Sequence, residues 1–160
     1  MAVKFLDIRI FGVEHCKRQL FKGQQRVANM KPALDIVADD MMWVIGVNFS
    51  SQGRRGGGSW KRLDPHTVNQ KAREGTLQRG ILVASGALHD SLTQRGDKDQ
   101  ELEVTPYMIR LGSALPYAAV HQTGDEELGI PQRDYLKFSS RDQERWVQIC
   151  EKSIMDALTK

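Results

Sequence analysis

Residues 32–49 read PALDIVADDMMWVIGVNF, and this stretch predicts the core helix of the fold. Apolar residues recur along it at steps of three and four, namely Leu34, Val37, Met41, Val44 and Ile45, with Ala38, Met42 and Phe49 extending the stripe. Pro32 suits the first helical turn, where a missing N–H donor costs nothing. The Met41-Met42-Trp43 cluster is apolar on more than one side, so one side either faces a neighbouring subunit or is buried in the monomer.

Two further amphipathic helices flank this core helix. Residues 14–26 carry apolar side chains at helical spacing and are followed by helix-ending signals near Asn29 to Pro32. A final helix begins at Ser140, which with Gln143 forms a predicted capping box. Its apolar face carries Trp146, Val147, Cys150, Ile154 and Leu158. Residues 3–10, VKFLDIRI, precede the first helix and predict a strand that could be exchanged between subunits.

Shorter elements lie between these helices. Asp64 and Pro65 predict a helix start, and Ser85 is a plausible cap for one or two turns. Residues 92–96, 101–105 and 107–112 predict strands, with Pro106 marking an edge or a bend, and residues 135–138 are expected to be extended. Residues 116–122 predict a short helix ended by Gly124. The order indicates an α+β fold, a small antiparallel sheet packed against two or three amphipathic helices, within a single domain of residues 1–160.

Residues 50–59 read SSQGRRGGGS and have no apolar side chain, which predicts a flexible glycine-arginine loop. Arg54, Arg55, Gly56, Gly57 and Gly58 could contact a neighbouring subunit or line a DNA channel, because arginine pairs with carboxylates and phosphates. A solvated loop is the alternative in an isolated monomer. A phosphate-binding loop of nucleotide hydrolases is excluded, because no Gly-Lys-Ser/Thr follows.

Composition narrows the function further. The chain has 160 residues and a net charge of +3, which permits contact with nucleic acid without requiring it. No apolar run is long enough to span a bilayer, and the first residues lack the apolar core of a signal peptide, so folding in the cytoplasm where the chain is made is expected. Two distant cysteines predict free thiols, and four scattered histidines lack metal-ligand spacing. We therefore expect no metal and no cofactor.

The middle of the chain carries an ordered series of short motifs. It runs through Trp60-Lys61-Arg62-Leu63-Asp64-Pro65-His66-Thr67, Ser85-Gly86-Ala87-Leu88-His89-Asp90-Ser91-Leu92, Pro116-Tyr117-Ala118, Val120-His121-Gln122, Gly124, Ile130-Pro131 and Arg133. This series resembles the phage virion morphogenesis family, which includes tail-completion proteins of Mu-like phages, and a related siphophage tail-component family. The chain departs from the family pattern at Arg133-Asp134-Tyr135-Leu136, where Arg-Pro-Phe-Leu is usual.

The resemblance implies a structural virion role rather than a reaction. Such proteins form a ring, commonly a hexamer, at the head-tail junction or neck. They join the tail terminator or tail tube to the head-side connector or stopper, with genomic DNA passing through the lumen. A tail terminator ring that caps the tail tube is the alternative reading. A small non-specific DNA-binding module is a third, resting on the positive charge and RRGGG.

The motif residues themselves are expected to be scaffold, forming caps, turns and core anchors. They are Trp60, Leu63, Pro65, Thr67, Gly86, Leu88, Ser91, Tyr117, Ala118, His121, Gly124 and Arg133. No catalytic residue is predicted, because His121 has no nucleophile or paired carboxylate motif near it. The acidic residues Asp125, Glu126 and Glu127 form either a solvated loop or a head-to-tail contact between ring subunits.

Overall fold

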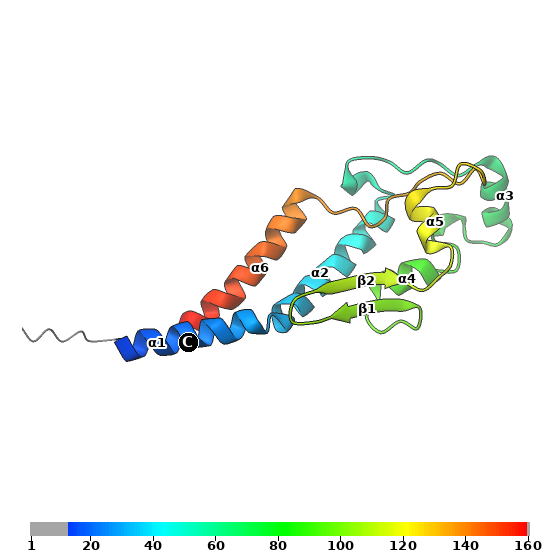
Figure 1. Cartoon of the computed structure of the whole chain (residues 1–160). Coiled ribbons are helices and arrows are strands. Elements are labelled where there is room, and N and C mark those ends of the chain that lie inside the picture. Colours follow the sequence, from blue (N-terminus) through cyan, green and yellow to red (C-terminus); the bar gives the residue numbers. More distant parts are fainter. Residues whose placement is uncertain (1–12, 160) are drawn as a thin grey trace, which may run out of the picture.

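The computed structural model describes residues 13–159, with side chains from residue 17 onward. It is an elongated α+β molecule (Figure 1). The described elements are α1 (Val13–Ala28), α2 (Lys31–Ser50), η1 (Arg54–Gly56), α3 (Pro65–Arg73), η2 (Leu77–Arg79), α4 (Ala87–Thr93), β1 (Gln100–Val104), β2 (Ile109–Ser113), α5 (Ala118–Thr123) and α6 (Ser140–Thr159). Helix α1 lies at one end and α3 at the other (Figure 1). The predicted strand at residues 3–10 lies outside the described residues.

Helix α2 is the central element, as the sequence predicts. Its buried side chains include Val37, Val44, Ile45 and Phe49, and it contacts α4, α6 and both strands. Pro32 lies in the first turn, as expected. The helix is therefore wrapped on several sides, which explains why its apolar residues extend beyond a single narrow stripe.

Helices α1 and α6 pack against each other beyond the start of α2 (Figure 1). Gly23 of α1 lies directly under Leu158 of α6, and a Cβ at this glycine would lie 2.6 Å from the leucine Cδ2. The absence of a side chain at residue 23 thus permits the close approach of the two helices. The predicted first and last helices are both confirmed.

The sheet is a two-stranded antiparallel hairpin in which Leu102 pairs with Leu111. Pro106 lies in the connecting turn, where its carbonyl accepts a hydrogen bond from the Met30 backbone N–H at 3.3 Å. The tip of the hairpin is thereby joined to the junction between α1 and α2. Two of the three predicted strands are confirmed, and the bend at Pro106 is the turn between them.

The predicted strand at residues 92–96 is wrong. Leu92 and Thr93 complete α4, and Gln94 to Asp99 form turns. Leu92 is fully buried and Ser91 donates to the carbonyl of Leu88, so helix packing decides the structure here. Residues 135–138 have no strand assignment. They run as an irregular segment whose backbone carbonyls are held by the side chain of Asn48.

Helix α6 begins at Ser140 as predicted, but its capping box lies one residue earlier than predicted. The capping pair is Ser139 and Asp142, not Ser140 and Gln143. The Asp142 backbone N–H donates to Ser139 Oγ at 3.3 Å, and the Ser139 N–H donates to the Asp142 carboxylate at 2.9 Å. Aspartate replaces the usual glutamate or glutamine of a capping box, which is why the sequence pattern pointed elsewhere.

A compact apolar core fills the α4 side of the molecule. It combines Phe49 of α2 with side chains from distant segments, namely Trp60, Ile81, Leu88, Leu92, Ala118 and Tyr135. The ring of Phe49 lies edge-on to that of Trp60, with centroids 5.7 Å apart. No helix among residues 13–159 is long and apolar enough to cross a membrane.

Candidate assembly interface

The glycine-arginine segment is tied to α6 by Arg55. The guanidinium of Arg55 donates two hydrogen bonds to the carboxylate of Asp142, one of them 2.9 Å long. The Asp142 side chain is 1% exposed and also accepts from Ser139 and Arg145. Hydrogen bonding to Arg55 holds the pKa of Asp142 well below its ordinary value, against the effect of burial.

Trp43 lies at the centre of the surface around this ion pair. Its side chain is 59% exposed. The guanidinium groups of Arg55 and Arg145 each lie 5.9 Å from its ring centroid. Arg145 is held in turn by Asp40 at 2.6 Å, and Asp40 also accepts from the indole of Trp146. Two arginines stacked on an exposed tryptophan give a surface suited to protein contact, because Trp and Arg are enriched in interfaces.

The segment therefore has more local structure than its composition predicts. Trp60 N–H donates to the carbonyl of Gln52 at 2.9 Å, which closes a loop around η1. Gly53 has φ +83°, and a Cβ there would lie 2.5 Å from the Trp60 ring. Arg54 is exposed and its Nε donates to the carbonyl of Ser51. Gly57 and Gly58 face open space and Gly56 lies against Lys137.

Several motif residues sit at helix starts and in the core. Asp64 caps α3 by accepting the Thr67 N–H at 2.9 Å, and Pro65 occupies the first turn. Trp60 is buried, while Leu63 packs against the core partly buried. Gly86 precedes α4 with φ +101°, a backbone conformation that favours glycine. Leu88 is buried in the core, and Ser91 Oγ lies 2.8 Å from the Ser113 hydroxyl.

Of the remaining motif residues, Tyr117, His121 and Arg133 line a cavity of about 480 Å³ beside α3 and α5, and Ala118 and Gly124 lie nearby in the sequence. Tyr117 stacks edge-on against His121, and Ala118 is buried. The carbonyl of His121 accepts the Arg133 N–H at 2.8 Å. Gly124 has φ +79°, and a Cβ there would lie 2.8 Å from the backbone nitrogen of Gln132.

Two buried cations line this cavity. Lys71 is 6% exposed and donates to the carbonyl of Val83 at 3.0 Å. Arg133 is equally buried and donates to the carbonyl of Lys61 at 3.3 Å. Burial lowers the pKa of both groups, and burial together with the charge of Arg133 lowers the pKa of His121. His121 Nδ1 and Arg133 Nε are buried without a hydrogen-bond partner among the described residues.

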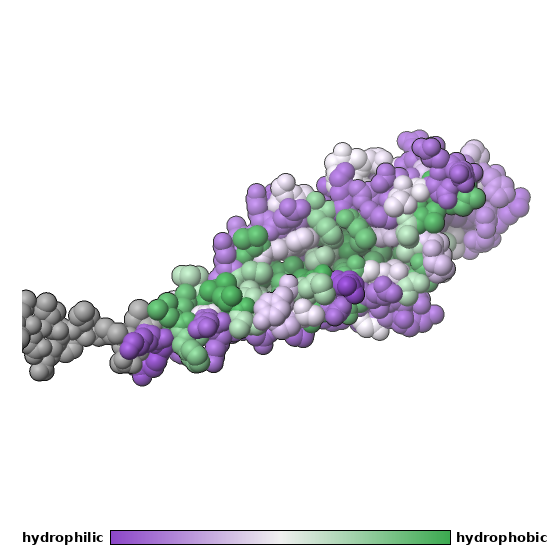
Figure 2. All heavy atoms as spheres, viewed as in Figure 1, coloured by the Kyte–Doolittle hydropathy of each residue, from purple (hydrophilic) through white to green (hydrophobic). Residues whose placement is uncertain are grey.

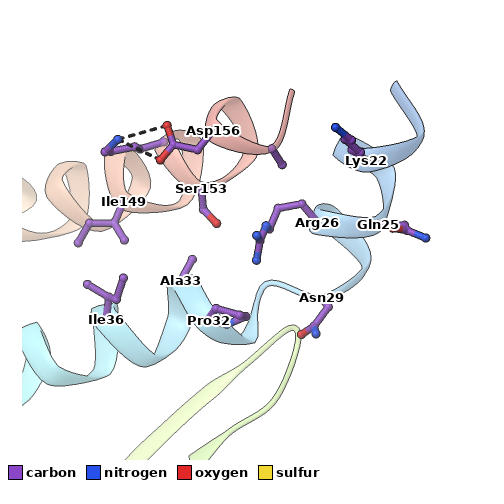
Figure 3. Close-up of a pocket in the computed structure, with 12 residues that line it drawn as sticks. Lys22, Gln25, Arg26, Asn29, Pro32, Ala33, Ile36, Ile149, Ser153 and Asp156 are labelled. Atoms are coloured by element: carbon purple, nitrogen blue, oxygen red, sulfur yellow. Dashed lines mark hydrogen bonds and ion pairs between the residues drawn. The ribbon is translucent and has the colours of Figure 1, made fainter. Parts of the chain in front are cut away.

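A larger groove of about 910 Å³ lies at the opposite end, between α1, α2 and α6 (Figure 3). Ala33 and Ile36 of α2 face Ile149 and Ser153 of α6 across it, and Arg26 of α1 points into it (Figure 3). Lys152 and Asp156 form an ion pair at 3.0 Å on the α6 side. The groove thus has an apolar floor and a charged rim.

Exposed apolar side chains gather on the same three helices. They are Leu20, Phe21, Val27, Ile36, Trp43, Val147 and Met155. Hydrophobic surface is visible along this part of the molecule in Figure 2. Single exposed apolar side chains are ordinary, but a concentration of them over one part of a small domain marks an interaction surface.

The acidic segment forms an ordered turn near α3 and the 480 Å³ cavity. Asp125 and Ile130 exchange backbone hydrogen bonds of 2.8 and 2.7 Å, and Asp125 Oδ1 accepts the Leu128 N–H. Glu126 and Glu127 are exposed, and Leu128 is 70% exposed at the tip. This geometry is consistent with both alternatives raised by the sequence, a solvated loop and a head-to-tail contact between ring subunits.

The model of the phage virion morphogenesis family matches residues 12–155. The chain belongs to this family. The match extends well beyond the motif series and includes α1, α2 and most of α6. Comparisons with curated proteins and with solved structures gave no match.

Membership of the phage virion morphogenesis family confirms the resemblance seen in the sequence. It gives the chain a structural role in assembly of the phage particle, and supports a structural rather than an enzymatic function. The exposed surfaces of α1, α2 and α6 and the acidic turn are therefore the candidate interfaces.

Three residues that organise these surfaces escaped the sequence-based selection. Asn48 is buried and donates to the carbonyls of Tyr135 and Lys137. Tyr135 is buried and donates to the carbonyl of Ala118 at 2.7 Å. Asp142 joins α6 to Arg55. The only local signal was Ser139-x-x-Asp142, a helix-start pattern, because the other two contacts join segments distant in sequence.

Proposed function

We propose that this chain forms a ring at the head-tail junction of a tailed phage, as a tail-completion subunit. The ring joins the tail terminator or tail tube to the head-side connector and surrounds the DNA channel. Membership of the phage virion morphogenesis family supplies the broad role. The observation that carries the more specific proposal is the distribution of contact surfaces over an elongated subunit.

Those surfaces lie at both ends of the molecule. The groove and the exposed apolar side chains of α1 and α6 lie at one end, whereas the acidic turn lies beside α3 at the other. Figure 1 shows how far apart α1 and α3 are. A subunit with two different contact surfaces can join copies in a single direction, which is the requirement for a closed ring.

The exposed part of the glycine-arginine segment offers a third surface. Arg54, Gly57 and Gly58 project from a base fixed by Arg55 and Trp60. In a ring these segments are repeated around an axis, so their arginines add to one basic belt. Such a belt would contact DNA phosphates without reading sequence, and the contacts would weaken with salt.

Imaging of intact virions tests the proposal directly. We expect density for this chain as a ring between the head connector and the tail terminator, encircling DNA. Depletion of the chain during infection should leave filled heads and complete tails unjoined. Density only on the end of the tail tube, with tails of abnormal length after depletion, would instead indicate a tail terminator and contradict the tail-completion assignment.

A further inference from the structure

We propose that neighbouring copies join head to tail through one specific contact. The acidic turn of one copy, residues 125–129, docks in the groove between α1, α2 and α6 of the next copy. This inference rests on the proposed ring function and names the interface that would build it. The occupant of the groove is a second copy of this chain.

The groove provides an apolar floor with basic groups beside it. Pro32, Ala33 and Ile36 contribute the α2 side, and Ile149 contributes from α6. Lys22 and Arg26 of α1 line the same groove, and neither has an ion-pair partner among the side chains described, those of residues 17–159. Figure 3 shows Arg26 extending from α1 toward the space between α2 and α6. An uncompensated pair of cations beside exposed apolar surface favours an acidic partner that also carries an apolar side chain.

The acidic turn has this combination of groups. Leu128 is 70% exposed at its tip, and Glu126 and Glu127 precede it directly. Neither glutamate has an ion pair in the described part of the chain. The turn is held by the backbone pairing of Asp125 with Ile130, so its shape is set before contact. Little conformational entropy would therefore be lost on docking, which favours association.

Charge and position both select a second copy as the partner. The groove is basic where the turn is acidic, and the groove offers apolar surface where the turn exposes leucine. The turn borders the cavity beside α3, at the end opposite to α1 (Figure 1). A chain therefore cannot place its own turn in its own groove, and the contact must be made between molecules. Repetition of this head-to-tail contact gives a directional assembly. The assembly closes into a ring when a whole number of subunit rotations makes one full turn.

Charge reversal on the full-length chain tests the contact. We expect the doubly substituted Lys22→Glu/Arg26→Glu chain to associate at least about tenfold more weakly than wild type, as judged by sedimentation velocity at low salt. Glu126→Lys/Glu127→Lys should weaken association to a similar degree. Mixing the two variants should restore pairing, because the reversed groove of one then meets the reversed turn of the other.

The mixed sample should form assemblies in which the two variants alternate, since the unchanged turn of the groove variant also fits the unchanged groove of the turn variant. A matched control, Arg62→Glu/Arg141→Glu, makes the same charge change at exposed arginines outside both surfaces and should assemble like wild type. Leu128→Asp tests the apolar part and should weaken association without altering the thermal stability of the monomer.

Three results would overturn the contact: a wild-type chain that stays monomeric at the highest concentration, unchanged association of both reversed variants, or no rescue on mixing. Failure of the neck-ring proposal is distinguishable from these. If virions built with the Lys22→Glu/Arg26→Glu variant still contain normal rings at the neck, the ring function stands and this interface is excluded. If the chain associates by the proposed contact but lies elsewhere in the particle, the interface stands and the neck-ring proposal fails.

Discussion

Arg55 and Asp142 form a bidentate ion pair across 87 positions of sequence. The pair joins the glycine-arginine segment to the first turn of α6, and it lies against the exposed ring of Trp43. One arginine of the RRGGG sequence is thus structural, whereas its neighbour Arg54 is exposed. The two adjacent arginines are therefore expected to respond differently to substitution.

Replacement of Asp142 by Asn should lower the free energy of unfolding by about 2–3 kcal/mol, because it leaves the Arg55 guanidinium without its counter-charge. Urea denaturation measures the change. Arg54→Gln is the matched control and should alter stability by less than about 0.5 kcal/mol. Equal effects at the two positions would contradict the assignment of a structural role to the ion pair.

The same pair predicts a pH dependence at low pH. The folded state depresses the pKa of Asp142 below its ordinary 3.8, so this carboxylate stabilises the fold above pH 3.8. As pH falls below that value, the unfolded chain takes up the proton first and the stabilisation is lost. The stability difference between wild type and Asp142→Asn should narrow accordingly. A difference that stays constant with pH would argue against this ionisation.

Tyr135 should make the protein sensitive to alkaline pH. Burial raises its pKa to about 12, above the ordinary 10.0, so between these values the unfolded chain ionises first and the folded state is destabilised. Tyr135→Phe removes this dependence and costs about 1–2 kcal/mol at neutral pH, because the Ala118 carbonyl loses its hydrogen bond. Tyr107→Phe, at a 76% exposed position, is the control and should behave like wild type.

Asn48→Asp should destabilise the protein strongly, by about 3 kcal/mol or more, because a buried amide donor to two carbonyls becomes an acceptor that repels them. Thermal unfolding measures the shift. The same chemical change at exposed Asn69 provides the comparison and should be close to neutral. Near-equal melting temperatures for the two variants would show that Asn48 does not hold the 135–137 segment.

Gly124→Ala should cost about 2 kcal/mol or more, since it combines a positive φ with a Cβ 2.8 Å from backbone nitrogen of Gln132. Gly57→Ala isolates the first effect, because Gly57 has φ +85° with open space around it. The glycine at 124 should therefore tolerate substitution less well than the glycine at 57. If the two alanine variants were equally stable, steric contact at Gln132 would not matter.

Local signals predicted the elements whose stability comes from their own sequence. The apolar stripe of residues 32–49 predicted α2, and Asp64-Pro65 predicted the start of α3, where Asp64 does cap the Thr67 N–H. The hairpin strands around Pro106 were also identified. Residues 92–96 were misassigned because β-strand and short buried helix patterns look alike over five residues, and the burial of Leu92 decided between them.

The candidate interface was predicted only in part. The glycine-arginine segment and the acidic turn stand out in sequence through composition and charge. The groove does not, because its walls come from three helices whose approach depends on the contact of Gly23 with Leu158. Trp43 was recognised as apolar on a second face, but its stacking under Arg55 and Arg145 requires α6 to lie alongside α2.

The sequence by itself determined the family, the α+β class and most of the helix positions, because periodicity, caps and glycine turns act over only a few residues. Tertiary structure alone decided that Arg55 is paired within the chain and that Asn48 and Tyr135 hold the segment leading into α6. It also placed the basic groove and the acidic turn at opposite ends of the molecule. Those relationships join residues far apart along the chain, and such pairs are set by how whole elements pack.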